Sequence, residues 1–394
     1  MLFPNIYNYE YLGRLNNFRP NAPDSVPIPR VNRFKRILLQ LNGSVTNHTL
    51  DGVIPVPHPD YPFGLLQRIS LIANGKEEIK FLRGASAFYK DCIIYNQTGT
   101  RLFNVPNPQI TAPIVGIIPL NIPLPKALDP VDMMFPTVDL VSLKLEVLYG
   151  GINDIIPGEA PPDFTVDGFY IDVWGELKTH KDILTSIFRE KWSDSKQLVI
   201  NNNFEIELDQ LDICRLWLRG FETGRSGELT PFDLGLVAPT VKIVAGNFKT
   251  DEIPLQIVAN NNFRDYGTEG YETPNLDTFP YYLLDFVKPE GKLTNTLDCR
   301  NINDPKMFLN INTLLQLNNP FIEVMYDYVE KVADNIKSET IFVKPIVKRT
   351  ADERGISYEQ NKAIVAPINK EKNTSVDLEG GGNIALGSTP LEIS

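Results

Sequence analysis

Histidine and cysteine are scarce in this 394-residue sequence, which contains three of each. The histidines, His48, His58 and His180, are scattered, and neither an HExxH nor a Cys-x-x-Cys motif is present. Because zinc sites draw their ligands from short spacings, the sequence predicts no metal site. The cysteines lie far apart, each in or beside an apolar segment, which favours buried free thiols made in a reducing compartment.

Catalytic and membrane-spanning motifs are missing as well. The sequence contains no GxxxxGK[ST] phosphate loop and no GxSxG nucleophile elbow, so we expect no catalytic residue and no cofactor. No apolar run reaches 18 residues, and the most apolar stretch, residues 112–125, contains four prolines, so no membrane-spanning helix is expected. The first residues lack a basic region followed by an apolar core, which argues against a secretory signal. These absences favour a structural protein over an enzyme.

The chain also lacks a net positive charge, since its formal net charge is −11. An acidic chain repels phosphate backbones, so we expect no direct sequence-specific binding to nucleic acid. Residues 1–36 are the exception, with six basic residues against Glu10 and Asp24. These six are Arg14, Arg19, Arg30, Arg33, Lys35 and Arg36.

Proline, in contrast, is abundant, with 31 residues. Frequent prolines interrupt helices and favour many short strands. Alternation with period two is the dominant pattern. Between Val141 and Val147 every second side chain is apolar, which predicts a strand with one buried face that begins at Val141 or before. Residues 65–75 end on Asn74-Gly75, a dipeptide typical of hairpin turns.

Two segments instead repeat apolar side chains at helical spacing, residues 82–97 and residues 254–267. Each predicted helix interrupts a series of predicted strands. The order of strands and helix is the same in both halves of the chain, and the two helices lie about 170 residues apart.

One short segment occurs twice, as YIDVWGEL at residues 170–177 and as FIEVMYDY at residues 321–328. Ile171 and Ile322 are 151 residues apart, and the two valines that follow keep the same spacing. In each copy we expect Ile and Val to point into a core, and the acids, such as Glu176, to lie outside or at a contact between domains. The repeat predicts a tandem duplication of one β-sandwich unit of roughly 150 residues.

The expected fold class is all-β, with two tandem eight-stranded jelly-roll β-sandwiches, each with a short helix insertion, and with extended N- and C-terminal arms. The first jelly roll is expected at residues 31–178 and the second at residues 196–340. Residues 179–195 are polar and are predicted to be a connector. Residues 1–30 and residues 341–394 are predicted to be the two arms.

Several segments are similar, in pattern and order, to those of a known family. They are LLQRISLIANGKEEI, DLVSLKLEVLYGG followed by VDGFYIDVWGELK, YYLLDFVKPEGKL, MFLNINTLLQL and FIEVMYDYVEK. They resemble the double jelly-roll major capsid proteins, which build the shells of adenovirus-like viruses and of tailless, membrane-containing icosahedral phages. The resemblance covers about residues 30–335 and lies in the architecture, since the family has no invariant motif.

The resemblance implies a homotrimer whose six jelly rolls form a pseudo-hexameric capsomer of an icosahedral shell. It also implies minor capsid and vertex proteins as partners, assembly in the host cytoplasm and a final location in the virion. It supplies no catalytic residue and no cofactor. If an internal viral membrane lies beneath the shell, the six basic residues of the N-terminal segment would face its anionic headgroups.

Alternatives remain open at this stage. The basic segment could pack under its own trimer instead of facing a membrane. The chain could be a minor vertex or spike protein. A tandem β-sandwich could also bind or cleave carbohydrate, with a sugar site lined by the aromatic residues Trp174, Trp192, Trp217, Tyr281 and Tyr282.

Overall fold

The computed structural model describes most of the chain up to Lys331. The described residues are 8–30, 33–50, 57–95, 99–102, 105–127, 140–156, 163–178, 186–193, 195–223, 229–266, 281–288, 295–314 and 317–331. The expected C-terminal arm at residues 341–394 lies outside them. Within these ranges no helix is long and apolar enough to cross a membrane.

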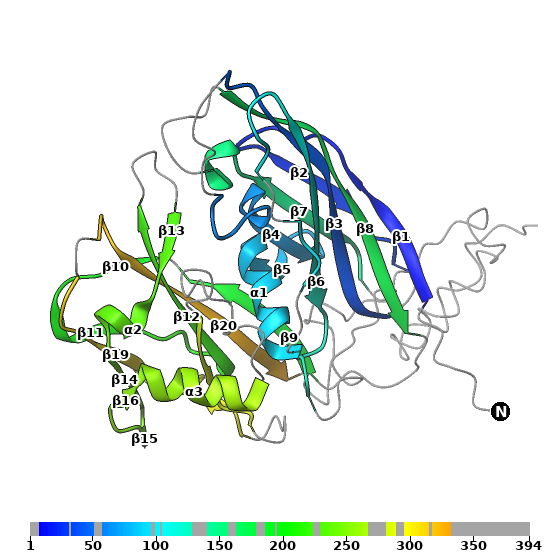
Figure 1. Cartoon of the computed structure of the whole chain (residues 1–394). Helices are drawn as coiled ribbons and strands as arrows, with labels where there is room; N and C mark the ends of the chain where they lie inside the picture. The colour runs from blue at the N-terminus through cyan, green and yellow to red at the C-terminus, as the bar shows by residue number, and fades with distance from the viewer. Residues whose placement is uncertain are drawn as a thin grey trace, which may run out of the picture.

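The first half of the chain forms a β-sandwich of eight strands (Figure 1). One sheet has the order β1-β8-β3-β6, and strands β2, β7, β4 and β5 form the facing layer in that order. The helix α1 (Gly84–Tyr95) lies between β5 and β6 in the chain. The strands are β1 (Asn8–Leu15), β2 (Pro23–Pro27), β3 (Arg33–Asn47), β4 (Leu66–Ala73), β5 (Glu77–Leu82), β6 (Thr111–Asn121), β7 (Leu143–Tyr149) and β8 (Phe164–Lys178).

The second half repeats this plan, with the sheets β9-β20-β12-β17 and β11-β19-β14-β15 and the helix α3 (Leu255–Tyr266). Its main strands are β9 (Ser186–Trp192), β11 (Asn201–Glu207), β12 (Asp212–Thr223), β14 (Thr240–Ala245), β15 (Phe248–Lys249), β17 (Tyr281–Asp285), β19 (Lys306–Ile311) and β20 (Phe321–Lys331). Shorter elements are β10 (Lys196–Gln197), β13 (Leu229–Phe232), α2 (Leu234–Val237), β16 (Ile253–Pro254) and β18 (Leu297–Asp298).

Strand register confirms the duplication in detail. Glu176 of β8 pairs with Arg36 of β3, and Asp327 of β20 pairs with Arg215 of β12. The two acids are 151 residues apart and the two arginines 179. Each strand pair also has an irregularity at the same place, between Phe34 and Arg36 in β3 and between the equivalent residues 213 and 215 in β12. The predicted all-β fold of two tandem jelly-roll sandwiches is therefore confirmed.

Local sequence signals account for several elements. Asn74 and Gly75 both have positive φ, +52° and +81°, as the two central residues of a hairpin turn between β4 and β5 require. Along β7, every second side chain from Leu143 to Tyr149 is buried, because that face covers the core of the first sandwich. The three cysteines are buried free thiols, as predicted.

Two segments differ from the sequence-based expectation. Residues 1–30, predicted to be an arm, contain β1 and β2, which belong to opposite sheets of the first sandwich. Residues 179–195, predicted to be a connector, contain β9, which pairs with β20 on one side and with β5 on the other. In the first segment, Leu12, Leu15 and Val26 are buried in the core of the first sandwich, which explains why this part of the chain is not an arm. The second segment is polar, but strand pairing satisfies its backbone groups whatever the side chains are.

Two side chains also lie differently from the prediction. Val141 was expected in the core but is 65% exposed, because β7 begins only at Leu143. Glu176 was expected outside the core or at a contact between domains but is buried within its own sheet, where Lys35 and Arg36 on the neighbouring strand β3 form ion pairs with it.

Candidate functional site: the seam between the sandwiches

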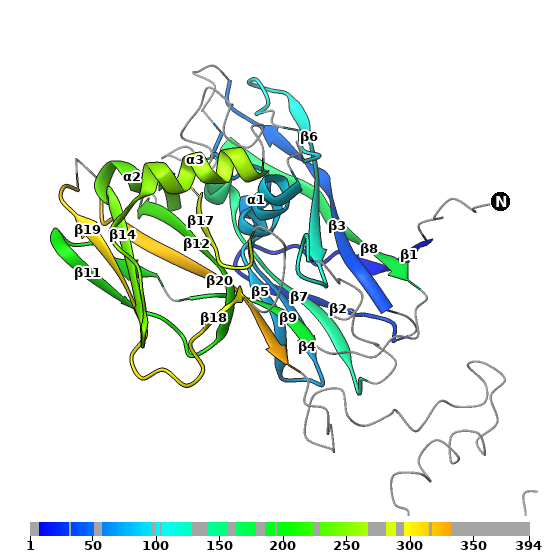
Figure 2. The same ribbon diagram turned by 90° about the horizontal axis from the view of Figure 1, so that it is seen from below.

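The two sandwiches meet along a contact surface that we call the seam. On one side lie β5 and α1 of the first sandwich, and on the other lies the sheet β9-β20-β12-β17 of the second (Figures 1 and 2). Strands β5 and β9 pair in parallel, which joins the sheets of the two sandwiches into one continuous sheet. Trp217, Tyr281 and Met325 of the second sandwich pack into the hydrophobic core of the first. The seam is therefore built like a domain interior.

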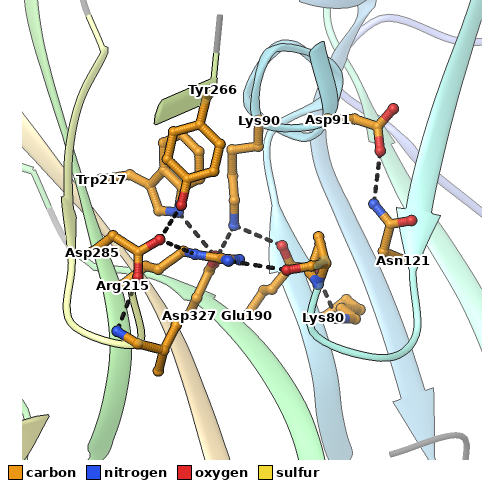
Figure 3. A network of polar contacts seen from close by, with 12 residues as sticks. Lys80, Lys90, Asp91, Asn121, Glu190, Arg215, Trp217, Tyr266, Asp285 and Asp327 are labelled. Atoms are coloured by element: carbon orange, nitrogen blue, oxygen red, sulfur yellow. Dashed lines mark hydrogen bonds and ion pairs between the residues drawn. The ribbon is translucent and has the colours of Figure 1, made fainter. Parts of the chain in front are cut away.

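Four charged side chains lie at the centre of the seam (Figure 3). Lys90 of α1 donates to Glu190 of β9 at 2.6 Å and to Asp327 of β20. Lys80 of β5 forms an ion pair with the other carboxylate oxygen of Glu190 at 2.8 Å. All four are at least 93% buried. Buried charges are tolerated when each has a counter-ion at close range, as here.

The surroundings shift the pKa values of this cluster. Burial raises the pKa of the Glu190 carboxyl, but Lys80 and Lys90 outweigh burial and lower that pKa to about 2. Burial lowers the pKa of Lys80 to about 8, against the opposing effect of Glu190. At neutral pH the two sandwiches are thus connected by an ionised carboxylate held between two ammonium groups.

A second cluster extends the seam along β12 (Figure 3). Arg215 donates from Nε to Asp285 of β17 at 3.0 Å, and the hydroxyl of Tyr266 of α3 also donates to Asp285. The guanidinium of Arg215 donates as well to a backbone carbonyl of the first sandwich, at residue 125, over 2.9 Å. The indole Nε1 of Trp217 donates to Asp327 at 2.9 Å. Arg215 therefore holds α3, β17 and the first sandwich together.

A third set of contacts lies at the other end of β12. Arg219 forms two hydrogen bonds with Asp60 of the first sandwich, at 2.6 and 3.1 Å. Arg83, just before α1, donates to Glu323 of β20 at 3.0 Å. Bidentate guanidinium–carboxylate pairs fix geometry as well as charge. The physical effect of the whole seam is to hold the two sandwiches in one fixed orientation.

The sequence prediction missed these residues, although a signal existed. The run DICRLWLRGFE contains two arginines, Arg215 and Arg219, spaced four apart in an otherwise apolar strand. Both therefore lie on one face of β12, with Trp217 between them. When two cations flank an aromatic residue on one face of an apolar strand, a buried ionic contact is a better interpretation of that face than exposure to solvent. Lys80 and Lys90 gave no comparable signal, because lysine is common on exposed strands and helices.

Three of the six basic residues predicted to face a membrane lie together on one face of the first sheet. Arg14 of β1 pairs with Asp172 of β8 at 2.7 Å. Lys35 and Arg36 of β3 both pair with Glu176, Lys35 at 2.9 Å. The charge of these three cations is therefore largely neutralised within the sheet.

The other three basic residues are dispersed. Arg30 donates to two backbone carbonyls, at residues 140 and 141, each over 2.8 Å. Arg19 is exposed between β1 and β2. Arg33 begins β3, and its side chain lies outside the described part of the structure. The five basic residues whose side chains are described therefore do not form one basic patch.

The residues proposed for a sugar site are not gathered on a surface either. Trp217, Tyr281 and Tyr282 are buried in the seam or in the core of the second sandwich. Trp174 and Trp192 are half-buried and lie on different sheets. Within the described ranges, no group of three or more His, Cys, Asp or Glu side chains could hold a metal ion.

Comparison with known proteins supports the fold described above. No protein-family model matches the sequence, and no curated protein matches it. Among solved structures, the chain is similar to the MCP of STIV, the Sulfolobus turreted icosahedral virus, with a TM-score of 0.63 and 14% identity over 82% of this chain and 95% of that chain. It is also similar to the major capsid protein of bacteriophage PM2, with a TM-score of 0.53 and 12% identity over 84% of this chain and 99% of that chain.

A third similar structure is a quasi-atomic model of the PBCV-1 virus capsid, with a TM-score of 0.54 and 12% identity over 85% of this chain and 97% of that chain. All three likenesses extend over both sandwiches, since each covers more than four fifths of the chain. The chain therefore has the double jelly-roll fold of viral major capsid proteins.

Proposed function

We propose that this protein is a major capsid protein, located in the shell of a virion and assembled in the host cytoplasm. The observation that carries the proposal is the pair of equivalent sandwiches held rigidly together, in the fold of the capsid proteins named above. Three copies would supply six equivalent sandwiches. Such a trimer has pseudo-six-fold symmetry and can tile a hexagonal lattice, with minor capsid and vertex proteins at the five-fold positions.

The test is the mass and shape of the purified protein. Light scattering is expected to give a stable trimer, three times the 44.4 kDa of one chain, or about 133 kDa. Negative-stain images are expected to show hexagonal tiles. A protein that remains monomeric at micromolar concentration would contradict the proposal.

We also propose that the N-terminal segment contacts an internal viral membrane through Arg19, which lies between β1 and β2. The support is that Arg19 is exposed, whereas Arg14 and Lys35 form ion pairs with acids of their own sheet. Arg19→Glu is expected to weaken flotation with anionic liposomes a few-fold, since each basic residue near such a surface contributes about 1 kcal/mol. Lys76→Glu, the same charge change in the exposed turn after β4, is the matched control. Equal flotation of the two variants would contradict a membrane contact through Arg19.

A further inference from the structure

One lysine lies between two acids at the centre of the seam (Figure 3). The Nζ atom of Lys90 donates to Oδ1 of Asp327 and, at 2.6 Å, to Oε1 of Glu190. All three residues are at most 7% exposed, because they lie between the two sandwiches. An amine in contact with a carboxyl group, with a second carboxylate at the same nitrogen, is the arrangement that an amide condensation needs.

The other oxygen of Asp327 faces two donors from β12. The indole Nε1 of Trp217 donates to Oδ2 at 2.9 Å, and Nη1 of Arg215 lies 4.0 Å from the same oxygen. This Nη1 is buried and has no hydrogen-bond partner among the described residues. Negative charge develops on a carboxyl oxygen when an amine attacks its carbon, and buried N–H groups stabilise that charge. The two donors therefore make Cγ of Asp327 a better electrophile.

A small hollow adjoins the three groups. Its volume is about 10 Å³, and Lys90, Glu190 and Asp327 all line it. A hollow of this size has room for about one water molecule. Condensation of an amine with a carboxylic acid releases one water molecule, and a site that excludes bulk water protects the resulting amide from the reverse reaction.

We propose that Lys90 and Asp327 become joined by a covalent isopeptide bond, which the chain forms by itself with Glu190 as the catalytic acid–base. The bond forms after the seam has closed, so newly folded chain contains the ion pairs described above. It joins α1 of the first sandwich to β20 of the second, between residues 237 positions apart. The inference goes beyond the proposed function and is independent of it, since one chain contains all the reacting groups.

The reaction combines one attack with two proton transfers. Lys90 first passes a proton to Oδ1 of Asp327, which leaves a neutral amine beside a neutral carboxylic acid. The amine attacks Cγ while Trp217 and Arg215 stabilise the charge on Oδ2. Glu190 takes a second proton from the nitrogen and passes it to Oδ1, so the C–O bond breaks and Oδ1 leaves as water. Both protons lost by the ammonium end on this water, and Glu190 is again a carboxylate.

The surroundings favour the neutral acid and disfavour the neutral amine. Burial raises the pKa of Asp327, and it does so more strongly than Lys90 lowers that pKa. Burial lowers the pKa of Lys90, but Asp327 and Glu190 outweigh burial and raise it. The amine is thus a minor form, so we expect condensation to be slower than folding and to depend on Glu190 as the proton acceptor.

The first sandwich contains the equivalent acid in contact with an exposed lysine. Glu176 of β8, the equivalent of Asp327, is buried and pairs with Nζ of Lys35 at 2.9 Å. The Lys35 side chain is 41% exposed, so water hydrates its ammonium and competes with amide formation. We therefore expect no bond at this pair, which serves as an internal comparison within the same chain.

A covalent bond would restrain the two sandwiches more strongly than ion pairs do. A cross-link over a long loop limits the unfolded chain, in the way that a disulfide does. The three cysteines are buried free thiols, so no disulfide restrains the described part of the chain. An amide is also insensitive to thiols, which suits a protein made in a reducing compartment.

The mass of the denatured chain tests the proposal. The folded full-length protein is incubated at neutral pH, unfolded and measured by mass spectrometry. We expect a mass lower than the sequence mass by one water molecule, in a fraction of the chain that rises with time. Chain kept in concentrated urea from the start is expected to retain the sequence mass, because the three groups are then far apart.

A tryptic digest locates the bond. Trypsin does not cleave after Lys90 once its amine is acylated, so residues 84–101 are expected in one branched product with residues 307–331. A succinimide at Asp167-Gly168 also loses one water molecule but gives no branched product. A bond between Lys80 and Glu190, whose charged atoms lie 2.8 Å apart, would instead join residues 77–83 to residues 190–191.

Three variants test the roles of the side chains. Glu190→Gln removes the proton acceptor and keeps the shape of the side chain, so the loss of water is expected to disappear. Asp209→Asn, the same kind of change in the exposed pair with Lys191, is expected to lose water as the wild type does. Lys90→Arg keeps the positive charge but has no amine, so it is expected to retain its sequence mass.

The outcomes are distinct. A folded wild-type chain that retains the sequence mass, or that loses water without the branched product of residues 84–101 and 307–331, overturns the proposal. Undiminished loss of water in Glu190→Gln overturns the role of Glu190. If that variant does not fold, the branched product of the wild type still decides whether the bond exists. Because the mass is measured on denatured chain, none of these results depends on whether the protein forms a trimer.

Discussion

Glu190→Ala is expected to lower the free energy of unfolding by roughly 3–5 kcal/mol, the usual cost of removing one partner from a buried charge cluster. Glu190 is the counter-ion of Lys80 and one of two counter-ions of Lys90. Without it, the Lys80 ammonium remains fully buried over the ring of Phe188, at 3.7 Å from the ring centroid, with its ion-pair partner gone.

Urea denaturation followed by tryptophan fluorescence measures the effect, because Trp217 lies in the same seam. The matched control is Asp209→Ala, which removes the acid of the Lys191–Asp209 pair, whose side chains are 46% and 40% exposed. An exposed pair contributes about 0–1 kcal/mol, so the control should differ little from the wild type. An equal loss of unfolding free energy in Glu190→Ala and Asp209→Ala would show that the charges of the seam do not hold the sandwiches together.

Lowering the pH should remove the stabilisation that Glu190 gives to the folded chain. The pKa of Glu190 is lowered from the ordinary 4.5 to about 2 in the folded chain, so its stabilising effect is complete above pH 4.5 and is lost as the pH falls toward 2. A shift of this size corresponds to about 3 kcal/mol. The Glu190→Ala variant lacks this group, so its stability should fall less than that of the wild type across the same interval. If the free energy of unfolding of the two proteins fell equally between pH 4.5 and pH 2, Glu190 would not be the group responsible.

The sequence predicted those features that depend on local pattern. The alternation that ends at Val147 placed β7, Asn74-Gly75 placed a hairpin turn, and the spacing of 151 residues placed β8 and β20 at equivalent positions. Each of these signals comes either from a few consecutive residues or from a segment that the sequence repeats. Patterns of this kind report which face of an element is apolar, and the two-sandwich fold follows from them.

The seam could not be predicted in the same way, because its residues are buried by the packing of one sandwich on the other. Arg36 and Arg215 occupy equivalent positions, yet Arg36 is half-buried and Arg215 is buried, and the alternation of either strand does not predict this difference. Similarly, the polar segment 179–195 gave no sign of β9, whose partners lie about 110 and 140 residues away in the chain. The duplication indicates which residues are equivalent, but only the tertiary packing shows which copy is covered.

Arg219→Met is the second substitution with a large expected effect, a loss of roughly 3–5 kcal/mol, because it leaves the buried carboxylate of Asp60 without its bidentate partner. Asp60→Leu is expected to cost a similar amount, since it strands the guanidinium of Arg219, which is fully buried. The double variant should be far less affected, within about 1–2 kcal/mol of the wild type, because replacing both members of a buried pair by apolar groups removes both desolvation costs.

A double-mutant cycle on these three variants measures the coupling directly, by urea denaturation of each protein at one pH and salt concentration. One unpaired atom supports the expectation that the double variant is nearly as stable as the wild type. The Nε of Arg219 is buried without a hydrogen-bond partner among the described residues, so the ion pair does not offset the whole cost of removing Arg219 from water. Additive losses would mean that Asp60 and Arg219 act on separate parts of the fold. Strong coupling would show that Asp60 and Arg219 act as one pair, which ties β12 to the loop before β4.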